Sequence, residues 1–489
     1  MSQSRPEHSV FDPNDTNRTA GHTEQFVSEE QRQVSAAHIV FDAAEKQDTR
    51  TCDADPFDEE LDENKLKSKP TPTGCRGFLL KCKYCFEYMI PPGGYIASAF
   101  TLGSANLGTG ILALPSAFNS MGMAMALIIL IIIVFFTIFS LYVMARCSDV
   151  TGMRTYPDIA KSILGYWPSV VISAFLVLYC LGIDVSYMIS IGNLFTPIFD
   201  DPSVPAYLRT KSGNRLITAM VWLVLIFPIC LLKSVDSLRH VSTLAVVMVM
   251  FFCVCMMVDC IKYWKVNGWR TDVHYFNTGN GAIVSLGSLL FACLVQMNAF
   301  EIYHQLNDAS PRKMVLVACL GMGTCGTFYF MSGIFGYCRF GSEVNDSILL
   351  KYQPRNSPEM WVSYFGMVIK LCVGFALHQI PIRDVYYHYM GWDVYRMTWY
   401  KNCFWCAISS SVVLVAGLFI PSINIVLGLV GSLCGGFVGL IYPPIMVMYC
   451  GQWSFKKVGW VEYFAMYLLL VLGIVGCVFG TAAAIYGVV

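Results

Sequence analysis

The amino-acid sequence predicts an all-α polytopic membrane protein with eleven transmembrane helices, and three observations lead to that fold class. Of the 489 residues, 55% are hydrophobic and only 13% are charged, whereas soluble domains carry roughly 25% charged residues. From Tyr95 onward, eleven apolar runs are each long enough to cross about 30 Å of hydrocarbon. The first and the sixth of these runs are interrupted by glycines or by polar residues.

The first 94 residues differ in composition from the rest of the chain. They hold 17 of the 33 acidic residues and 11 of the 33 basic residues. Residues 1–70 are polar with few aromatics, which favours disorder. The basic cluster that follows, between Lys65 and Lys83, suits a cytosolic membrane face, and a solvated linker explains it equally well. We therefore predict a cytosolic tail over 1–94, acidic and then basic, and a transmembrane domain over 95–489.

The eleven runs form two sets of five and one additional run. Runs one to five lie within 95–263, runs six to ten within 281–447, and the eleventh covers 460–487. Aromatic residues fall at several run edges, as they do at membrane interfaces. The expected limits are 95–118, 122–146, 168–198, 214–232, 241–263, 281–303, 313–337, 359–382, 403–419, 423–447 and 460–487.

The distribution of lysine and arginine between the runs predicts the orientation. With the N-terminus inside, 15 basic residues lie in cytosolic segments near the membrane and 9 lie on the opposite side. This bias favours a cytosolic N-terminus and an extracellular C-terminus. It also places the sequon that begins at Asn345 outside, where glycosylation can occur. We expect the plasma membrane, with a vacuolar or lysosomal membrane as the second choice.

The first run contains the most informative segment, Ser104-Ala-Asn-Leu-Gly-Thr-Gly-Ile-Leu-Ala-Leu-Pro115. Hydrocarbon offers no replacement for a lost backbone hydrogen bond, so a helix break survives only inside protein or beside an aqueous cavity. Freed amides and carbonyls at such a break can hold a polar ligand. The alternative is that Gly108 and Gly110 only allow close helix packing.

The sixth run becomes polar partway along, at Gln296, Asn298 and Glu301. Two interrupted helices five apart are typical of two inverted five-helix repeats whose first helices unwind at the midplane. Amides after Gly110 should attract a carboxylate, and freed carbonyls at both breaks should receive an ammonium group. An α-amino acid fits this arrangement. The predicted binding residues are Ser104, Ala105, Asn106, Gly108, Thr109, Gly110, Gln296, Asn298 and Ala299, to which Asp184 is added below.

The segment from Ala105 to Pro115 resembles the first-helix motif of the amino acid/auxin permease family. The segments from Phe291 to Tyr303 and from Ile380 to Arg383 are similar to its sixth-helix and eighth-helix motifs. The Pro-Pro-Gly-Gly lead-in at 91–94 and the long polar tail are most similar to kinetoplastid members. The resemblance covers roughly 90–489. It implies the broken-helix fold of transporters of the leucine-transporter type, and transport of amino acids.

Asp184 lies in the middle of the third run, where the family usually has a small or apolar residue. An ionisable group inside the membrane suggests a functional site. We favour a pairing of Asp184 with the cationic side chain of arginine, lysine or ornithine. A proton-carrying carboxylate and a structural ion pair with Lys370 remain as alternatives.

Lys370 lies one helical turn from Gly374, on the same face of the eighth run. Sodium-coupled relatives are expected to have a hydroxyl ligand where this chain has Gly374, so a sodium site is in doubt. The Lys370 ammonium group either replaces that sodium ion or has only a structural role in helix packing. Glu301 is expected to cap the inner half of helix six rather than contact substrate. His378 either relays protons or is simply hydrogen-bonded.

No sequence motif for catalysis is present, so we expect no enzyme. No metal, nucleic acid or obligate protein partner is expected, and no cofactor other than a coupled proton. The expected function is an amino-acid permease that works by alternating access around a midplane site. It is expected to be proton-coupled or facilitative and to prefer cationic over neutral amino acids by a small margin. Its expected partners are an L-amino-acid substrate and the lipid bilayer. The alternative is an amino-acid sensor that signals through the N-terminal tail.

Overall fold

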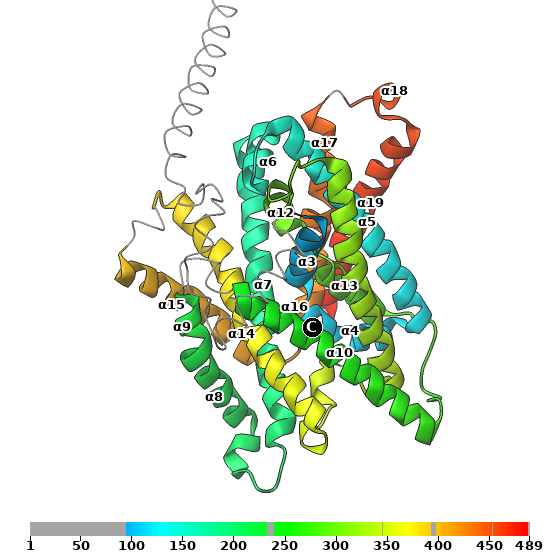
Figure 1. Cartoon of the computed structure of the whole chain (residues 1–489), viewed down its shortest axis with the longest axis vertical. Helices are drawn as coiled ribbons and strands as arrows, with labels where there is room; N and C mark the ends of the chain where they lie inside the picture. The colour runs from blue at the N-terminus through cyan, green and yellow to red at the C-terminus, as the bar shows by residue number, and fades with distance from the viewer. Residues whose placement is uncertain (1–93, 232–238, 345, 393–397, 452, 488–489) are drawn as a thin grey trace, which may run out of the picture. The chain divides into compact units, whose positions relative to one another are not determined.

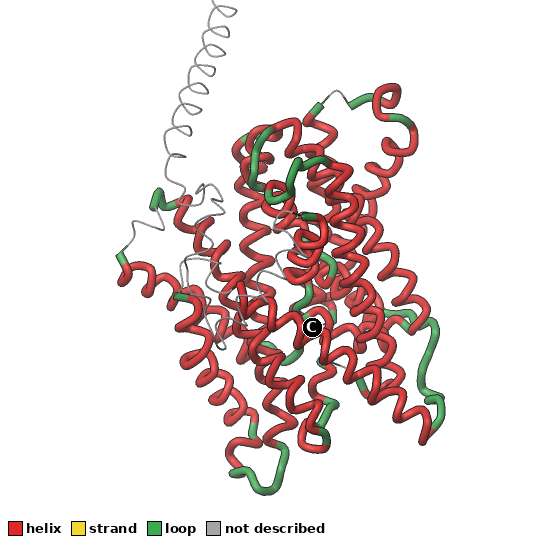
Figure 2. Tube along the Cα trace, viewed as in Figure 1, coloured by secondary structure: helices red, strands yellow, loops and turns green. Residues whose placement is uncertain are grey.

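A computed structural model describes residues 94–231, 239–344, 346–392, 398–451 and 453–487. Within these residues every regular element is a helix and no strand is present (Figure 2). Ten helices are long and apolar enough to cross a membrane, or eleven if a bent pair near the start of the described chain is one span. This confirms the predicted all-helical, polytopic class.

The helices, labelled as in Figure 1, follow the predicted runs closely. Two of the spans contain a π-helical stretch, at Trp222–Ile226 and at Gly431–Ile441. The α-helices are α3 (Tyr95–Asn106), α4 (Gly110–Met121), α5 (Met123–Thr151), α6 (Tyr156–Leu164), α7 (Tyr166–Phe199), α8 (Lys211–Val221), α9 (Phe227–Cys230), α10 (Arg239–Asn267), α11 (Asn280–Ala292), α12 (Ala299–His304), α13 (Pro311–Phe340), α14 (Pro358–Tyr389), α15 (Trp399–Phe419), α16 (Ile423–Val430), α17 (Tyr442–Cys450), α18 (Phe455–Val458) and α19 (Trp460–Tyr486).

The exposed faces of the helices are apolar. On α5, Ile131 and Phe135 are 62% and 64% exposed, and on α19 Phe464 is 62% exposed. Contiguous exposed apolar surface of this kind marks contact with another apolar phase, and spans of 20 to 34 residues are long enough to cross a bilayer. The polar backbone breaks lie away from these faces, inside the bundle.

The first break lies between α3 and α4, which are bent by 65° relative to each other. Leu107, the residue after α3, has an extended backbone, and α4 begins again at Gly110. A Cβ atom at Gly110 would lie 2.8 Å from the Cβ of Ala292. Only glycine therefore allows the start of α4 to contact the end of α11 this closely.

The second break follows α11. Its last residue is Ala292, and the chain then passes through a single 3₁₀ turn, Gln296–Asn298, before α12 begins. The contact between Gly110 and Ala292 brings the two breaks together, although they are far apart in the sequence.

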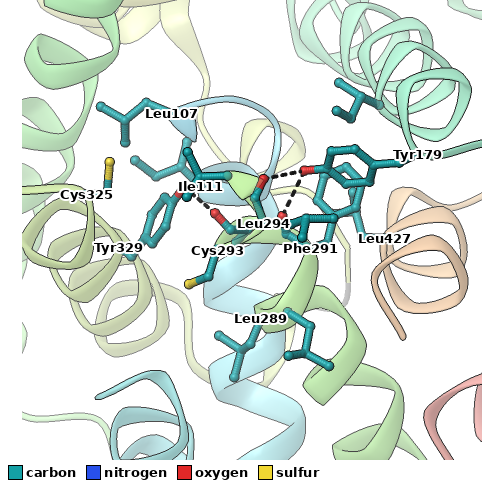
Figure 3. Packing of buried hydrophobic residues seen from close by; sticks show 14 of the residues in the cluster. Leu107, Ile111, Tyr179, Leu289, Phe291, Cys293, Leu294, Cys325, Tyr329 and Leu427 are labelled. Atoms are coloured by element: carbon teal, nitrogen blue, oxygen red, sulfur yellow. Dashed lines mark hydrogen bonds between the residues drawn. The ribbon is translucent and has the colours of Figure 1, made fainter. Parts of the chain in front are cut away.

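Two tyrosines bond the carbonyls that the breaks leave without helical partners. The Tyr329 hydroxyl lies 3.0 Å from the Asn106 carbonyl oxygen and 2.6 Å from that of Ala292, so it is shared between the last turns of α3 and α11. The Tyr179 hydroxyl lies 3.0 Å from the carbonyl oxygen of Leu294 (Figure 3). Buried carbonyls need such donors, so these side chains make the breaks tolerable in an apolar bundle.

Replacing Tyr329 with phenylalanine tests this role. Tyr329 is 0% exposed, and loss of its hydroxyl leaves two buried carbonyls without their donor, at a cost of roughly 1–3 kcal/mol. We expect the melting temperature of the detergent-purified Tyr329→Phe variant to fall by several degrees. Tyr166→Phe is the matched control, because Tyr166 is 56% exposed. Equal melting temperatures for both variants would contradict this role.

Candidate functional site

A small cavity lies between the two breaks. It leaves about 20 Å³ of room for the centres of water molecules, roughly the space of one or two waters. The walls come from both breaks, from α7 and from α14. The lining residues are Ala105, Asn106, Gly108, Thr109, Gly110, Tyr179, Ile183, Tyr187, Phe291, Ala292, Leu294, Val295, Met297, Asn298 and His378.

The amide side of the cavity is formed by the link between α3 and α4. The backbone N–H groups of Gly108, Thr109 and Gly110 donate no hydrogen bond to any described residue. They precede or begin α4, a helix of 12 residues, whose N-terminus carries partial positive charge. Unsatisfied amides at a helix N-terminus bind anionic groups, including carboxylates. This wall of the cavity can therefore receive a negative charge.

The link is held against α7. The hydroxyls of Thr109 and Ser186 lie 2.7 Å apart, and both side chains are buried. The hydroxyl of Tyr187 lies 3.1 Å from the position that a Cβ of Gly108 would take. The Tyr187 ring also packs on His378, with ring centroids 5.7 Å apart. Glycine at 108 thus lets a phenol hydroxyl reach the backbone at the cavity.

Two backbone carbonyls in the last turn of α3 accept hydrogen bonds from side chains of other helices. Lys370 of α14 is 4% exposed, and its Nζ lies 3.3 Å from the carbonyl oxygen of Ser104 in the last turn of α3. Helix C-termini attract positive charge, so the ammonium group is favourably placed. The Asn106 carbonyl accepts from Tyr329. These protein donors occupy two of the carbonyls that we expected to receive a substrate ammonium group, those of Ser104 and Asn106.

The structure brings together most, but not all, of the predicted binding residues. Ser104 takes part through its bond to Lys370 and does not line the cavity. Gln296 is 1% exposed and its side chain faces away, with Nε2 3.4 Å from Ser140 Oγ. Ala299 is buried outside the lining. The predicted residues that do line the cavity are Ala105, Asn106, Gly108, Thr109, Gly110 and Asn298.

Asp184 does not line the cavity, although the sequence places it in the substrate pocket. It is 0% exposed, and its Oδ2 accepts a hydrogen bond of 2.6 Å from Gln379 Nε2 on α14. The Oε1 of Gln379 accepts in turn from Ser409 on α15, at 2.8 Å. Among the described residues, no ion pair joins Asp184 to Lys370. The predicted structural pair is therefore absent from this conformation.

The remaining predicted residues lie in different surroundings. Glu301 is exposed in the first turn of α12, but its side chain makes no capping bond and instead lies 3.4 Å from Gln305 Nε2. His378 lines the cavity, and its Nδ1–H donates to the Gly374 carbonyl at 2.7 Å. Asn345, the candidate glycosylation residue, lies outside the described residues.

Several lining residues were not predicted. Tyr179, Ile183 and Tyr187 on α7 are spaced four apart and therefore share one helix face. Two tyrosines at this spacing in an apolar run are a usable signal, because a buried phenol hydroxyl needs a polar partner. Phe291 and Met297 carry no comparable signal, since apolar residues are common throughout the sixth run.

Comparison with known proteins gives a family and several relatives. Residues 92–486 match the family described as transmembrane amino acid transporter protein. The chain is 24% identical to vacuolar amino acid transporter 5 of Schizosaccharomyces pombe, over 72% of this chain and 84% of the relative. It is 22% identical to amino acid transporter AVT6E of Arabidopsis thaliana, over 80% and 83% respectively. It is 23% identical to sodium-coupled neutral amino acid transporter 7 of Xenopus laevis, over 72% and 80%.

The family match spans both helix breaks and every lining residue of the cavity. It confirms the resemblance to amino acid permeases at the level of the family. This chain belongs to the transmembrane amino acid transporter family.

Proposed function

We propose that the protein carries an α-amino acid across its membrane, bound in the cavity between the two helix breaks. One observation carries this proposal: the N–H groups of Gly108, Thr109 and Gly110 face a buried cavity without a backbone acceptor. An α-carboxylate is the anionic group that every amino acid shares. The Tyr187 hydroxyl beside Gly108 supplies a further donor at the same wall.

Alternating access explains the small size of the cavity. About 20 Å³ is too little for an amino acid, so the helices must separate to admit one. Hydrogen bonds join the broken helices to neighbouring helices: His304 Nε2 of α12 lies 2.9 Å from Ser148 Oγ of α5, and Asn424 Nδ2 of α16 lies 2.8 Å from Ser116 Oγ of α4. We propose that 95–263 and 281–447 are inverted repeats, with α19 additional, and that α3, α4, α11 and α12 rock against α7 and α14.

The lining favours a neutral side chain. Ile183, Phe291 and Met297 contribute apolar surface, and the expected preference for cationic amino acids depended on Asp184, which lies outside the lining. We therefore propose neutral amino acids first and cationic ones second. An apolar pocket discriminates weakly between aliphatic side chains, so the substrate range should be broad.

Lys370 supports transport that does not use sodium. Its ammonium group lies at the C-terminal end of α3, where a fixed positive charge stabilises the helix terminus. No side-chain hydroxyl can come from Gly374, whose Cβ would lie 2.9 Å from the Tyr187 ring. We propose that Lys370 supplies this charge permanently, and that transport is proton-coupled or facilitative.

The membrane address and orientation stay proposals. The bias of basic residues supports a cytosolic N-terminus and an extracellular C-terminus. We propose the plasma membrane, with a vacuolar membrane as the alternative because two relatives are named as vacuolar. The similarity of the Pro-Pro-Gly-Gly lead-in to kinetoplastid members stays an expectation, and its first three residues lie outside the described residues.

Uptake by proteoliposomes tests the function and the substrate preference. We expect labelled leucine to enter protein-containing vesicles, with arginine entering more slowly, because the lining lacks an acidic side chain. A panel of twenty competing amino acids then ranks the substrates. Binding without accumulation or exchange would contradict a carrier and would support the sensor alternative.

The contribution of Tyr187 is tested by a single hydroxyl deletion. We expect Tyr187→Phe to raise the KM for leucine by about tenfold, since one hydrogen bond to a carboxylate contributes roughly 1.5 kcal/mol. Tyr166→Phe, at an exposed position, should leave the KM unchanged. An unchanged KM in Tyr187→Phe would contradict a hydrogen bond between the Tyr187 hydroxyl and the substrate.

Sodium replacement tests the role of Lys370. We expect leucine uptake to persist when sodium is replaced by N-methylglucamine. The Lys370 ammonium group already supplies the positive charge that a sodium ion would otherwise supply. Lys370→Met should abolish uptake, whereas Lys161→Met, at an exposed position on α6, should not. Sodium-dependent uptake by the wild-type protein would contradict the proposal.

A further inference from the structure

A fully buried carboxylate lies next to the wall of the cavity. Asp184 is 0% exposed on α7. Three residues later, Tyr187 lines the cavity, and two residues later, Ser186 bonds to Thr109 in the glycine link. The carboxylate itself points elsewhere, towards Gln379 of α14. It is therefore close to the substrate site in the fold without contacting a ligand there.

The hydrogen bonding of Asp184 is incomplete. Its Oδ2 accepts the 2.6 Å bond from Gln379 Nε2. Its Oδ1 has no hydrogen-bond partner in the part of the chain that the structure describes. An ionised carboxylate in a dry interior needs donors at both oxygens or a nearby cation. With one neutral donor at one oxygen, the charged form is strongly disfavoured in this conformation.

In the part of the chain that the structure describes, no ion pair compensates for the charge of Asp184. The basic groups of α14 have other partners, because Lys370 bonds to Ser104, His378 to Gly374, and Arg383 lies 3.8 Å from Asp384. The titratable groups that interact with Asp184 include two thiols and a phenol, namely Cys180 and Tyr187 on α7 and Cys230 on α9, and Cys230 in turn interacts with Cys406 on α15 and Cys372 on α14.

We propose that Asp184 binds the proton that drives transport, taking it up as the cavity closes and releasing it when the separation of the glycine link from α7 admits water to the carboxylate. This proposal rests on the proposed amino-acid transport. On release, the carboxyl O–H bond breaks and the proton passes to water, with no other change in bonding. A group that is neutral when buried and ionised when hydrated must exchange a proton at each change of conformation.

The position of Asp184 connects this proton to the substrate. Opening the cavity separates the glycine link from α7 and so breaks the bond between Thr109 and Ser186. The same movement alters the contact of Tyr187 with His378, and His378 directly precedes Gln379, the donor to Asp184. Ser409 on α15 holds the other end of Gln379 at 2.8 Å. Substrate and proton therefore act on the same helix contact, which makes their coupling reciprocal.

Proteoliposomes with a proton gradient test the proposal. With the outside acidic, the wild-type protein should accumulate labelled leucine above its external concentration. Asp184→Asn should still exchange leucine for leucine, but it should not accumulate leucine and its rate should be independent of pH between about pH 5 and pH 8. Asp308→Asn is the control, because Asp308 is 97% exposed and should retain wild-type accumulation.

The outcomes separate this proposal from the function on which it rests. A wild-type pH profile in Asp184→Asn, or wild-type transport that ignores the proton gradient, would overturn the role of Asp184 while leaving amino-acid transport intact. If Asp184→Asn exchanges no leucine, the Gln379→Leu variant tests the role of Asp184 instead. Loss of the donor to Oδ2 favours the protonated form, so the midpoint of proton-dependent uptake should move to higher pH, and an unchanged midpoint would overturn the proposal. Absence of leucine exchange by the wild-type protein would overturn both.

Discussion

The structure depends on how the protein satisfies backbone groups that two helix breaks release inside an apolar bundle. Carbonyls at both breaks are bonded by side chains from other helices, chiefly Tyr329, Tyr179 and Lys370. The amides of the glycine link have no such partner among the described residues. The glycine link therefore leaves three backbone donors open to the cavity. A site built this way attracts the negatively charged end of a ligand.

The second requirement is that helix backbones approach each other closely, and glycine residues at the contacts make this possible. Gly110 lets α4 begin against Ala292, and the absence of a Cβ at Gly108 and at Gly374 leaves room for the Tyr187 ring. Larger residues at these positions would separate the helices or displace the tyrosine. The two roles predicted for these glycines, close helix packing and ligand binding, are therefore compatible, because the close packing forms the cavity.

The two buried charges near the cavity are kept apart. Lys370 lies at the C-terminal end of α3 and bonds to a carbonyl, whereas Asp184 accepts a bond from an uncharged amide. An ion pair between them would have lowered the free energy of both charged forms. Without it, the lysine has a favourable interaction with a helix terminus, whereas the carboxylate has a single uncharged donor. This difference suits a fixed cation and a group that changes its protonation state.

The sequence by itself determined the helical, membrane-spanning class, the interruption at Gly108–Gly110 and the polar segment at Gln296–Asn298, because apolar length and helix breaking are local properties. It also placed Ala105, Asn106, Thr109 and Asn298 at the site. Only the tertiary structure decided that Gln296 faces Ser140, that Asp184 faces Gln379, and that Tyr329 joins the two breaks. These partners come from helices distant in the sequence, and their rotation and register follow from packing rather than from any local pattern.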